Sequence, residues 1–148
     1  MKTYKIRPIG DSDIPLAYNI FSTNRALPWS IESFTQSVNS GVCLVAEIEG
    51  QLQGYILCSV IFETAEVLDI SVQKNVQNLG IGSALMNAVI ECFQSKKIEK
   101  LILEVDEFNA AAIGLYEKYD FRTIDIRKNY YQDSAGNCSN ALVMCLSL

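Results

Sequence analysis

A glycine-containing loop is the segment of this chain best suited to bind a ligand. Residues 77–83 read Gln-Asn-Leu-Gly-Ile-Gly-Ser and lie between an apolar strand-like segment and an amphipathic helical one. Glycines let backbone N–H groups approach a ligand closely, and the first turn of a helix has unpaired N–H donors and a partial positive charge. The glycine loop therefore predicts a pyrophosphate site, although Gly80 and Gly82 alone are equally consistent with a tight turn.

Two better-known phosphate sites do not fit the glycine loop. A P-loop requires Gly-Lys-Ser/Thr, whereas here Ser83 follows Gly82 directly. A dinucleotide-binding turn requires a third glycine where Leu85 stands, and it places its glycines immediately after the strand. Here residues 73–79 intervene, so both sites are excluded.

Two other residues are candidates for proton transfer. The chain contains no histidine, which excludes Ser-His and Cys-His nucleophile schemes and most transition-metal sites. Glu104 interrupts the apolar strand pattern 101–105, so it is either a solvated carboxylate or a general base whose partial burial would make it effective at neutral pH. Tyr116 follows Asn109 by seven residues, two helical turns, and is either a core aromatic or a general acid on the same helix face.

Hydrophobic periodicity predicts the elements that position these residues. Strands are expected at 3–8, 42–49, 53–62, 66–72, 101–105, 121–127 and 141–146. Helices are expected around 16–21 after capping side chains at 11–13, at 31–39 after Ser30, from 81 to 93, and at 110–118. With two early helices and one after each of two later strands, this order favours an α/β (α+β) domain over residues 1–148, in which a largely antiparallel sheet has helices on both faces.

One strand has a pattern that assigns its side chains to faces. Alternation across 66–72 places Leu68, Ile70 and Val72 on one face of the sheet. The same alternation places Val67, Asp69 and Ser71 on the other face.

Composition narrows the class of protein. Hydrophobic residues make up 49% of the chain, enough for one core, and the net charge of −5 argues against a nucleic-acid partner. No apolar run reaches the length of a membrane span and residues 1–6 lack a signal-peptide core, so we expect a cytoplasmic protein with no membrane partner. Five cysteines without C-x-x-C spacing argue against a disulfide framework and a zinc site. Four of them lie among apolar residues and are expected to be buried thiols: Cys43, Cys58, Cys92 and Cys145. An exposed edge on the last strand is expected to permit at most a weak dimer of an otherwise monomeric chain.

The pattern Gln77-x-x-Gly80-x-Gly82 after strand 68–72 resembles the coenzyme A-binding motif of the GCN5-related N-acetyltransferases (GNAT). Further segments are similar to the RimI branch of that superfamily, and they occur in the same order along most of the chain: Pro-Trp-Ser at 28–30, Leu-Glu-Val at 103–105, Asn-Ala-Ala-Ala-Ile at 109–113 and Arg-Lys-Asn-Tyr-Tyr at 127–131. Three residues depart from the family pattern. Asn78 stands where a basic residue is common, Ser71 where alanine is common, and Asp120 where glycine usually precedes Phe121.

The resemblance implies a GNAT fold with a single mixed, largely antiparallel sheet of roughly six to seven strands flanked by about four helices. It implies acetyl-CoA as cosubstrate and no metal. It also implies transfer of the acetyl group to the N-terminal α-amine of a protein, in the RimI branch the N-terminal alanine of a small-subunit ribosomal protein.

The resemblance also assigns roles to individual residues. It places Ile70, Ser71 and Val72 beside the pantetheine arm, in a strand splayed from its neighbour, and Asn109 in contact with coenzyme A. The pyrophosphate would lie on the loop residues Asn78, Leu79, Gly80, Ile81, Gly82 and Ser83. Glu104 would be the general base and Tyr116 the general acid.

The residues expected to bind the acceptor amine are less clearly indicated by the sequence than those expected to bind coenzyme A. Trp29, Tyr130 and Tyr131 are expected to line its groove, with Trp29 equally consistent with a core residue. Glu63, Glu66 and Asp69 form either a surface that attracts a basic peptide or an ordinary solvated face. Alternative acceptors are a small amine or a lysine side chain. Alternative functions are a non-catalytic acyl-CoA-binding module and an unrelated nucleotide-binding domain.

Overall fold

A computed structural model describes residues 4–25, 27–77 and 79–148. Thr3, predicted in the first strand, and Asn78, predicted to bind coenzyme A, lie outside the described residues. The strands are β1 (Tyr4–Pro8), β2 (Val42–Ile48), β3 (Gln51–Ile61), β4 (Thr64–Val72), β5 (Lys100–Asp106), β6 (Arg122–Gln132) and β7 (Cys138–Ser147). The α-helices are α1 (Ile14–Thr23), α2 (Ile31–Ser40), α3 (Ile81–Ser95) and α4 (Ala110–Lys118).

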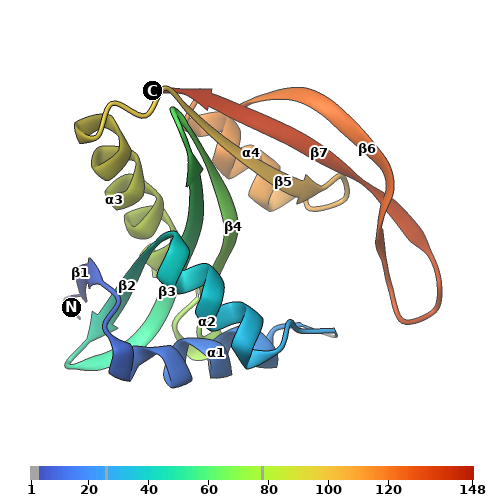
Figure 1. Cartoon of the computed structure of the whole chain (residues 1–148). Coiled ribbons are helices and arrows are strands. Elements are labelled where there is room, and N and C mark those ends of the chain that lie inside the picture. The colour runs from blue at the N-terminus through green and yellow to red at the C-terminus, as the bar shows by residue number, and fades with distance from the viewer. Residues whose placement is uncertain (1–3, 26, 78) are drawn as a thin grey trace.

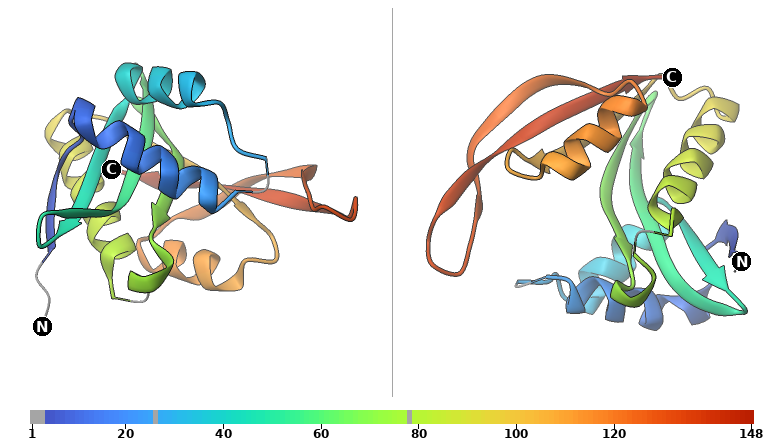
Figure 2. Two further views of the ribbon diagram at one scale, coloured as in Figure 1. Left: turned by 90° about the horizontal axis from the view of Figure 1, so that it is seen from below. Right: turned by 180° about the vertical axis from the view of Figure 1, so that it is seen from behind.

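All seven strands form one mixed sheet in the order β1-β2-β3-β4-β5-β7-β6. Every neighbouring pair is antiparallel except β4 and β5. Helices α1 and α2 cover one face of the sheet, and α3 and α4 cover the other (Figures 1 and 2). The predicted fold class, a largely antiparallel sheet with helices on both faces, is therefore confirmed.

Each face of the sheet packs its own hydrophobic cluster. The cluster under α1 and α2 is rich in aromatic side chains, among them Phe21, Phe34 and Tyr55, which are at most 2% exposed. The cluster under α3 contains Leu85, Val89 and other buried side chains of that helix. These positions repeat at helical spacing in the sequence, which explains why the helices were predictable.

Helix starts were predicted correctly where the capping interaction is local. The Ser30 hydroxyl accepts a hydrogen bond from the Ser33 N–H (3.1 Å) at the start of α2. The predicted cap before α1 is wrong, because residues 11–13 form a short 3₁₀ turn instead. The Asp13 carboxylate accepts from the Gly10 N–H (2.7 Å) and forms an ion pair with Arg7 on β1 (2.6 Å), which anchors the start of α1 to the first strand.

Strand β4 contains a β-bulge that corrects the predicted faces. Leu57 of β3 pairs with Asp69 and Cys58 pairs with Val67, so Leu68 is the extra residue of the bulge. As a result Val67 joins Ile70 and Val72 in the cluster under α3, while Leu68 packs against the cluster under α1 and α2. The predicted grouping of Leu68 with Ile70 is therefore wrong.

The C-terminal part of the sheet differs from the prediction in extent and in edge. The predicted strand 121–127 continues to Gln132, and the last strand begins at Cys138. The β6–β7 hairpin extends away from the rest of the sheet (Figure 1). The expected edge on the last strand is wrong, because β7 lies between β5 and β6 and the edges are β1 and β6.

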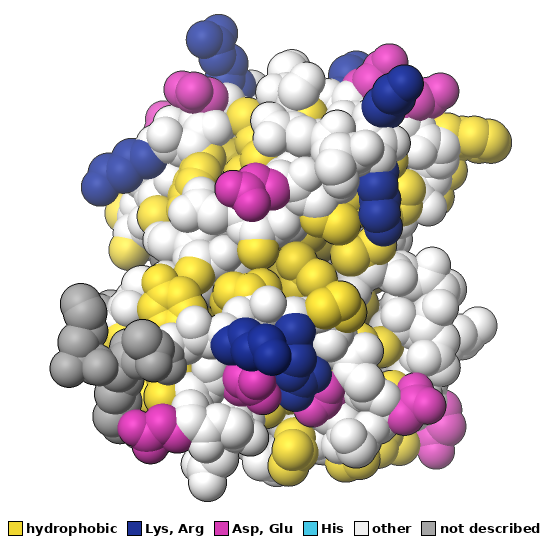
Figure 3. Space-filling model, turned by 90° about the vertical axis from the view of Figure 1, so that its left-hand side faces the viewer, with side chains coloured by type: hydrophobic (Ala, Val, Ile, Leu, Met, Phe, Trp, Pro, Cys, Tyr) yellow, Lys and Arg dark blue, Asp and Glu magenta, His cyan; other side chains and the backbone are white. Residues whose placement is uncertain are grey.

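On the face that carries α3, Lys and Arg side chains are interspersed with Asp and Glu side chains (Figure 3). Cys43 and Cys58 are buried as predicted, and burial raises the pKa of the Cys43 thiol to about 12. The prediction of buried thiols is wrong for Cys92 and Cys145, which are only half-buried. Cys138 is exposed. Across residues 4–25, 27–77 and 79–148, no helix has the length and apolar character needed to cross a membrane.

Candidate active site

The two parallel strands β4 and β5 diverge within the sheet. They pair only from Thr64 to Glu66, which lie opposite Lys100 to Ile102, and the bulge at Leu68 follows directly. A bulge bends its strand and increases the local twist. From this point β4 and β5 run in different directions (Figure 1), which leaves backbone groups of 67–72 without a neighbouring strand on that side.

The glycine loop leads from β4 into α3. Gly80 has a φ of +82°, a left-handed conformation that glycine adopts without steric cost, and Ile81 begins the helix. Helices α2 and α4 begin with side-chain caps, from Ser30 and from Asn109, whose Oδ1 accepts from the Ala112 N–H (3.2 Å). Within the described part of the chain, no side chain caps α3. Its first N–H groups are therefore available to an anion.

A first cavity, which we call the glycine-loop cavity, lies where β4 meets the start of α3. Its walls come from β4, the glycine loop, α3 and α4: Ile70, Val72, Val76, Gln77, Gly80, Ile81, Gly82, Ser83, Met86, Ala112, Leu115 and Tyr116. The Gln77 side chain donates to the Val72 carbonyl (3.1 Å), and the Tyr119 hydroxyl donates to the Ser83 carbonyl (3.1 Å). These two bonds hold the loop against β4 and α4.

A second cavity, the β4–β5 cavity, opens between the diverging strands. It measures about 560 Å³, within the range of small-ligand sites. Its lining residues are Arg25, Trp29, Glu66, Val67, Leu68, Asp69, Ile70, Leu103, Glu104, Val105, Asp106, Asn109, Ala112, Tyr116, Tyr130 and Tyr131. Ile70, Ala112 and Tyr116 line both cavities, so the cavities meet at these side chains.

The structure distributes the predicted residues between the two cavities. Most predicted coenzyme-binding residues line the glycine-loop cavity, but Asn109 lines the β4–β5 cavity. Leu79 belongs to the loop but does not line the cavity, and it is 56% exposed. Ser71 contributes only backbone to this side, because its hydroxyl donates to Asp69 (3.0 Å) toward the α1–α2 face. The predicted acceptor residues Trp29, Tyr130 and Tyr131 line the β4–β5 cavity.

Glu104 points into the β4–β5 cavity, on the opposite side of β5 from the buried Leu103 and Val105. Its side chain is 14% exposed, and its Oε1 lies 3.3 Å from Nε of Arg127 on β6. The solvated-carboxylate interpretation is therefore wrong. The carboxylate is mostly enclosed and faces a cavity, with the Arg127 guanidinium beside it.

Burial and the charge of Glu104 together shift the pKa values of the titratable groups around this carboxylate. Burial and then the negative charge of Glu104 raise the pKa of Glu66. Burial first, followed by the same charge, raises the pKa of Tyr131 to about 12. The pKa of Tyr130 is raised mainly because its hydroxyl can donate to Glu104. Burial raises the pKa of Tyr116, so that the phenol stays protonated at neutral pH.

The three acidic residues predicted to form a surface have different environments. Glu63 is exposed in the turn between β3 and β4. Glu66 lines the β4–β5 cavity, as does Asp69, but the Asp69 side chain is only 4% exposed. It is ion-paired to Arg25 and accepts hydrogen bonds from Tyr55 and Ser71. The expectation that Asp69 belongs to a solvated or peptide-attracting surface is therefore wrong.

Sequence reasoning missed two cations of this site, Arg25 and Arg127. Arg127 was part of a recognised segment, yet nothing in the local pattern linked it to Glu104, 23 residues earlier. Arg25 follows α1 and meets Asp69 across 44 residues of sequence. Contacts of this separation depend on the sheet register rather than on periodicity.

A protein-family model described as "Acetyltransferase (GNAT) family" matches residues 13–121 of the chain. The chain belongs to this family. The GNAT match spans the glycine loop, both diverging strands and α4, and thus most of the two cavities. The chain is accordingly an acyltransferase, and the predicted resemblance is confirmed.

Individual GNAT proteins are similar over nearly the whole chain. The [ribosomal protein bS18]-alanine N-acetyltransferase of Escherichia coli is 31% identical over 144 residues, which cover 97% of each chain. A crystal structure of an Escherichia coli enzyme with this activity in its name superimposes with a TM-score of 0.92 at 30% identity, covering 98% of this chain and 94% of that one. A GNAT acetyltransferase from Elizabethkingia anophelis, solved with acetyl-CoA bound, gives a TM-score of 0.83 at 27% identity, covering 98% of each chain.

Proposed function

We propose that this chain, as one acetyltransferase domain over residues 1–148, transfers the acetyl group of acetyl-CoA to the N-terminal α-amine of a protein. The α-amine attacks the thioester carbonyl, the C–N bond forms, and the C–S bond breaks to release coenzyme A as a thiol. The observation that carries the proposal is the junction of the two cavities. One has a helix start that no side chain of the described residues caps, which suits a diphosphate, the other has Glu104, and Tyr116 lies where they meet.

Acetyl-CoA would occupy the glycine-loop cavity. The free N–H groups at the start of α3 and its positive dipole end suit the pyrophosphate, and the unpaired backbone of 70–72 suits the amide groups of the pantetheine arm. The acetyl group would then reach the junction near Ile70. The acetyl-CoA-bound relative from Elizabethkingia anophelis supports this cosubstrate.

Glu104 would accept the proton that the amine loses. An α-amine titrates near pH ~7.7–8.0, against ~10.4 for a lysine side chain, so one carboxylate suffices to keep an N-terminus neutral at the moment of attack. Glu104 faces the cavity with limited access to water. Arg127, whose Nε lies 3.3 Å from Oε1, orients its carboxylate.

Tyr116 would protonate the departing thiolate. Its raised pKa keeps the proton on the phenol until the thiolate forms. Its ring packs against Phe121, with centroids 5.7 Å apart, which restricts the side chain to the junction.

The acceptor is proposed to be the N-terminal alanine of ribosomal protein bS18. The name of the Escherichia coli relative supports this choice, since the two chains align over 97% of their lengths. The connection between α1 and α2 and the β6–β7 hairpin extend on the same side of the molecule (Figures 1 and 2), and they bring Trp29 and the Tyr130–Tyr131 pair to one cavity. Ribosomal proteins are made in the cytoplasm, where we expect this chain to act.

Thiol release from acetyl-CoA tests the proposal. We expect release with a peptide carrying the bS18 N-terminus, and none with the same peptide after its α-amine has been blocked. A peptide with a blocked N-terminus and a free lysine serves as the matched control for side-chain acetylation. Turnover only with the lysine peptide or with small amines would refute the acceptor. Acetyl-CoA binding without turnover on any amine would favour a non-catalytic module.

A further inference from the structure

A buried polar network centred on Asp69 connects the two sides of the site. The Asp69 carboxylate accepts hydrogen bonds from the Tyr55 hydroxyl on β3 and from the Ser71 hydroxyl (3.0 Å) on its own strand. It also forms an ion pair with the guanidinium of Arg25. Tyr55 and Ser71 are 0% and 6% exposed, so this carboxylate lies well inside the protein.

Arg25 belongs to the segment between α1 and α2, and the same segment carries Trp29. Both side chains pack on Phe21: the Arg25 guanidinium lies 5.2 Å from its ring centroid, and the Trp29 ring 5.0 Å. The Trp29 carbonyl also accepts from the Tyr18 hydroxyl (2.7 Å). Arg25 thus connects this segment to the sheet through an ion pair, and Trp29 packs on the same ring, that of Phe21.

Asp69 stands between the bulge residue Leu68 and Ile70, which lines both cavities. The α1–α2 segment, which forms one wall of the β4–β5 cavity, is therefore attached to β4, the strand beside which acetyl-CoA is proposed to bind. A buried ion pair is weak evidence for stability, since an apolar pair often packs as well. Its presence here calls for another role, because it fixes the position of one element relative to another.

We propose that the Arg25–Asp69 ion pair positions the α1–α2 segment, and with it Trp29, against the acceptor peptide. Arg25 and Asp69 are positioning residues for the acceptor, with no part in proton transfer. The inference rests on the proposed function in naming a peptide as the acceptor. It predicts that breaking the pair weakens use of the peptide and leaves use of acetyl-CoA intact.

Three variants separate positioning from stability. Asp69→Asn keeps an acceptor for Tyr55 and Ser71 but removes the charge that holds Arg25, whose side chain is 38% exposed and can turn to water. Arg25→Met leaves the buried carboxylate without its cation and should lower the Tm. The double variant removes both charges and should recover the Tm.

Kinetics give the first measurement. We expect the KM for the peptide to rise about tenfold in all three variants, with the KM for acetyl-CoA within about twofold of wild type. Arg122→Met, which removes an exposed arginine on β6, is the matched control and should change neither constant. If both the peptide KM and the Tm return to their wild-type values in the double variant, the proposal is overturned.

Fluorescence gives a second measurement that does not depend on activity. Trp29 is the only tryptophan of the chain, so its emission reports on this segment alone. We expect acrylamide to quench Trp29 more strongly in Asp69→Asn and in the double variant than in wild type or Arg122→Met. Equal quenching in all four proteins would overturn the inference, whereas failure of wild type to acetylate any peptide would refute only the proposed function.

Discussion

The most informative perturbation of the proposed chemistry is Glu104→Gln. Glutamine has the size of glutamate but cannot accept the proton of an ammonium group. We expect kcat to fall by roughly a hundredfold or more near neutral pH, since general bases contribute about 10²–10⁴-fold. Arg127 loses its partner in this variant, but its side chain is 55% exposed and can be solvated, so the fold should be retained.

The size of the loss should depend on pH in a defined way. With a pKa near ~7.8, an α-amine is about 5% neutral at pH ~6.5 and about 94% neutral at pH ~9. Without a base, only the neutral fraction reacts, so the variant's kcat should rise about 20-fold over this interval. The wild-type enzyme removes the proton itself and should show a much smaller rise. The ratio of variant to wild-type kcat should therefore increase with pH.

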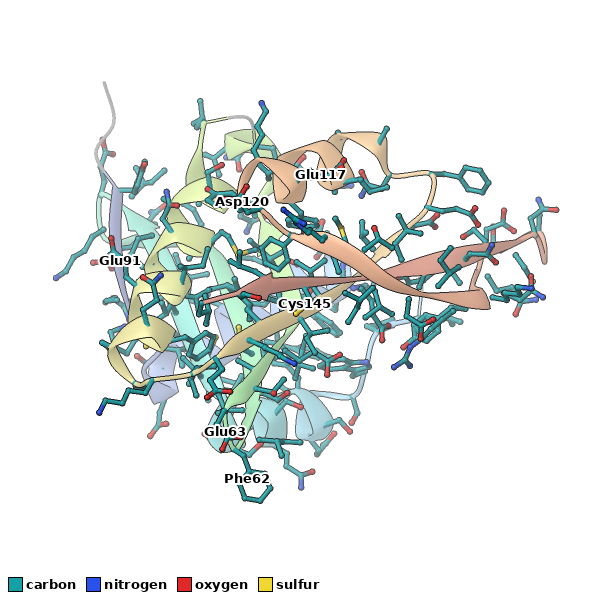
Figure 4. All side chains as sticks on the ribbon, turned by 90° about the horizontal axis from the view of Figure 1, so that it is seen from above. Phe62, Glu63, Glu91, Glu117, Asp120 and Cys145 are labelled. Carbon is teal, nitrogen blue, oxygen red and sulfur yellow. The ribbon has the colours of Figure 1, made fainter. Side chains whose placement is uncertain are left out.

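Initial rates of thiol release at saturating peptide and acetyl-CoA check this expectation. Glu117→Gln, an exposed carboxylate on α4 (Figure 4), is the control and should behave as wild type at every pH. Acetyl-CoA affinity should be unchanged, since Glu104 does not line the glycine-loop cavity. A ratio of kcat values that stays constant from pH ~6.5 to ~9 would refute the role of Glu104 as a base for the amine.

Three further perturbations test the rest of the site and one turn. Tyr116→Phe should lower kcat about tenfold or more and leave the affinity for acetyl-CoA unchanged. Because the pKa of Tyr116 is raised, wild-type kcat should not fall up to pH ~9. A variant that turns over at the wild-type rate would argue against Tyr116 as the general acid. Gly80→Val places a β-branched residue at φ +82° and should weaken acetyl-CoA binding in calorimetry, whereas an unchanged Kd would argue against the helix start as the pyrophosphate site. Asp120, which follows α4 (Figure 4), has a φ of +72°. Asp120→Gly should therefore increase the free energy of unfolding by about 1 kcal/mol and raise the Tm by about 2–4 °C. An unchanged or lower Tm would contradict this expectation.

The elements predictable from sequence are those whose signals are local. Helix α3 was expected from the repeat of apolar residues between 81 and 93, and it extends from Ile81 to Ser95. Helix α2 begins where Ser30 caps it. The glycine loop was recognised because its residues act together within seven positions of sequence. Asp120 stands where the family usually has glycine, and its φ of +72° is the left-handed conformation that glycine adopts without steric cost.

The features that sequence reasoning missed depend on pairing between distant segments. Strand β6 is exposed along nearly all of its length, so it has no hydrophobic alternation that could mark its end. Aspartate is usually a surface residue, and the burial of Asp69 is possible because Tyr55, Ser71 and Arg25 satisfy its carboxylate. The bulge is invisible to periodicity, because a single extra residue changes the face of every side chain on one side of it.

The bulge also explains why the site lies where it does, and deletion of Leu68 tests this. Removing Leu68 leaves Val67 opposite Cys58 and Asp69 opposite Leu57 in one regular ladder, so every other side chain keeps its face and the protein should still fold. A regular β4 can continue alongside β5 beyond Glu66, which would pair the backbone groups of 70–72 that are proposed to bind the pantetheine arm and would also close the β4–β5 cavity. We therefore expect the Kd for acetyl-CoA to rise about tenfold or more, with circular dichroism unchanged.

The matched control is Leu68→Ala, which removes most of the same side chain but keeps the extra backbone residue. It should lose some stability, because Leu68 packs against the cluster under α1 and α2, and it should bind acetyl-CoA as wild type does. If the deletion and the alanine variant bind acetyl-CoA equally well, the divergence of β4 and β5 does not depend on the bulge. If only the deletion loses binding, one backbone residue is what separates the two strands.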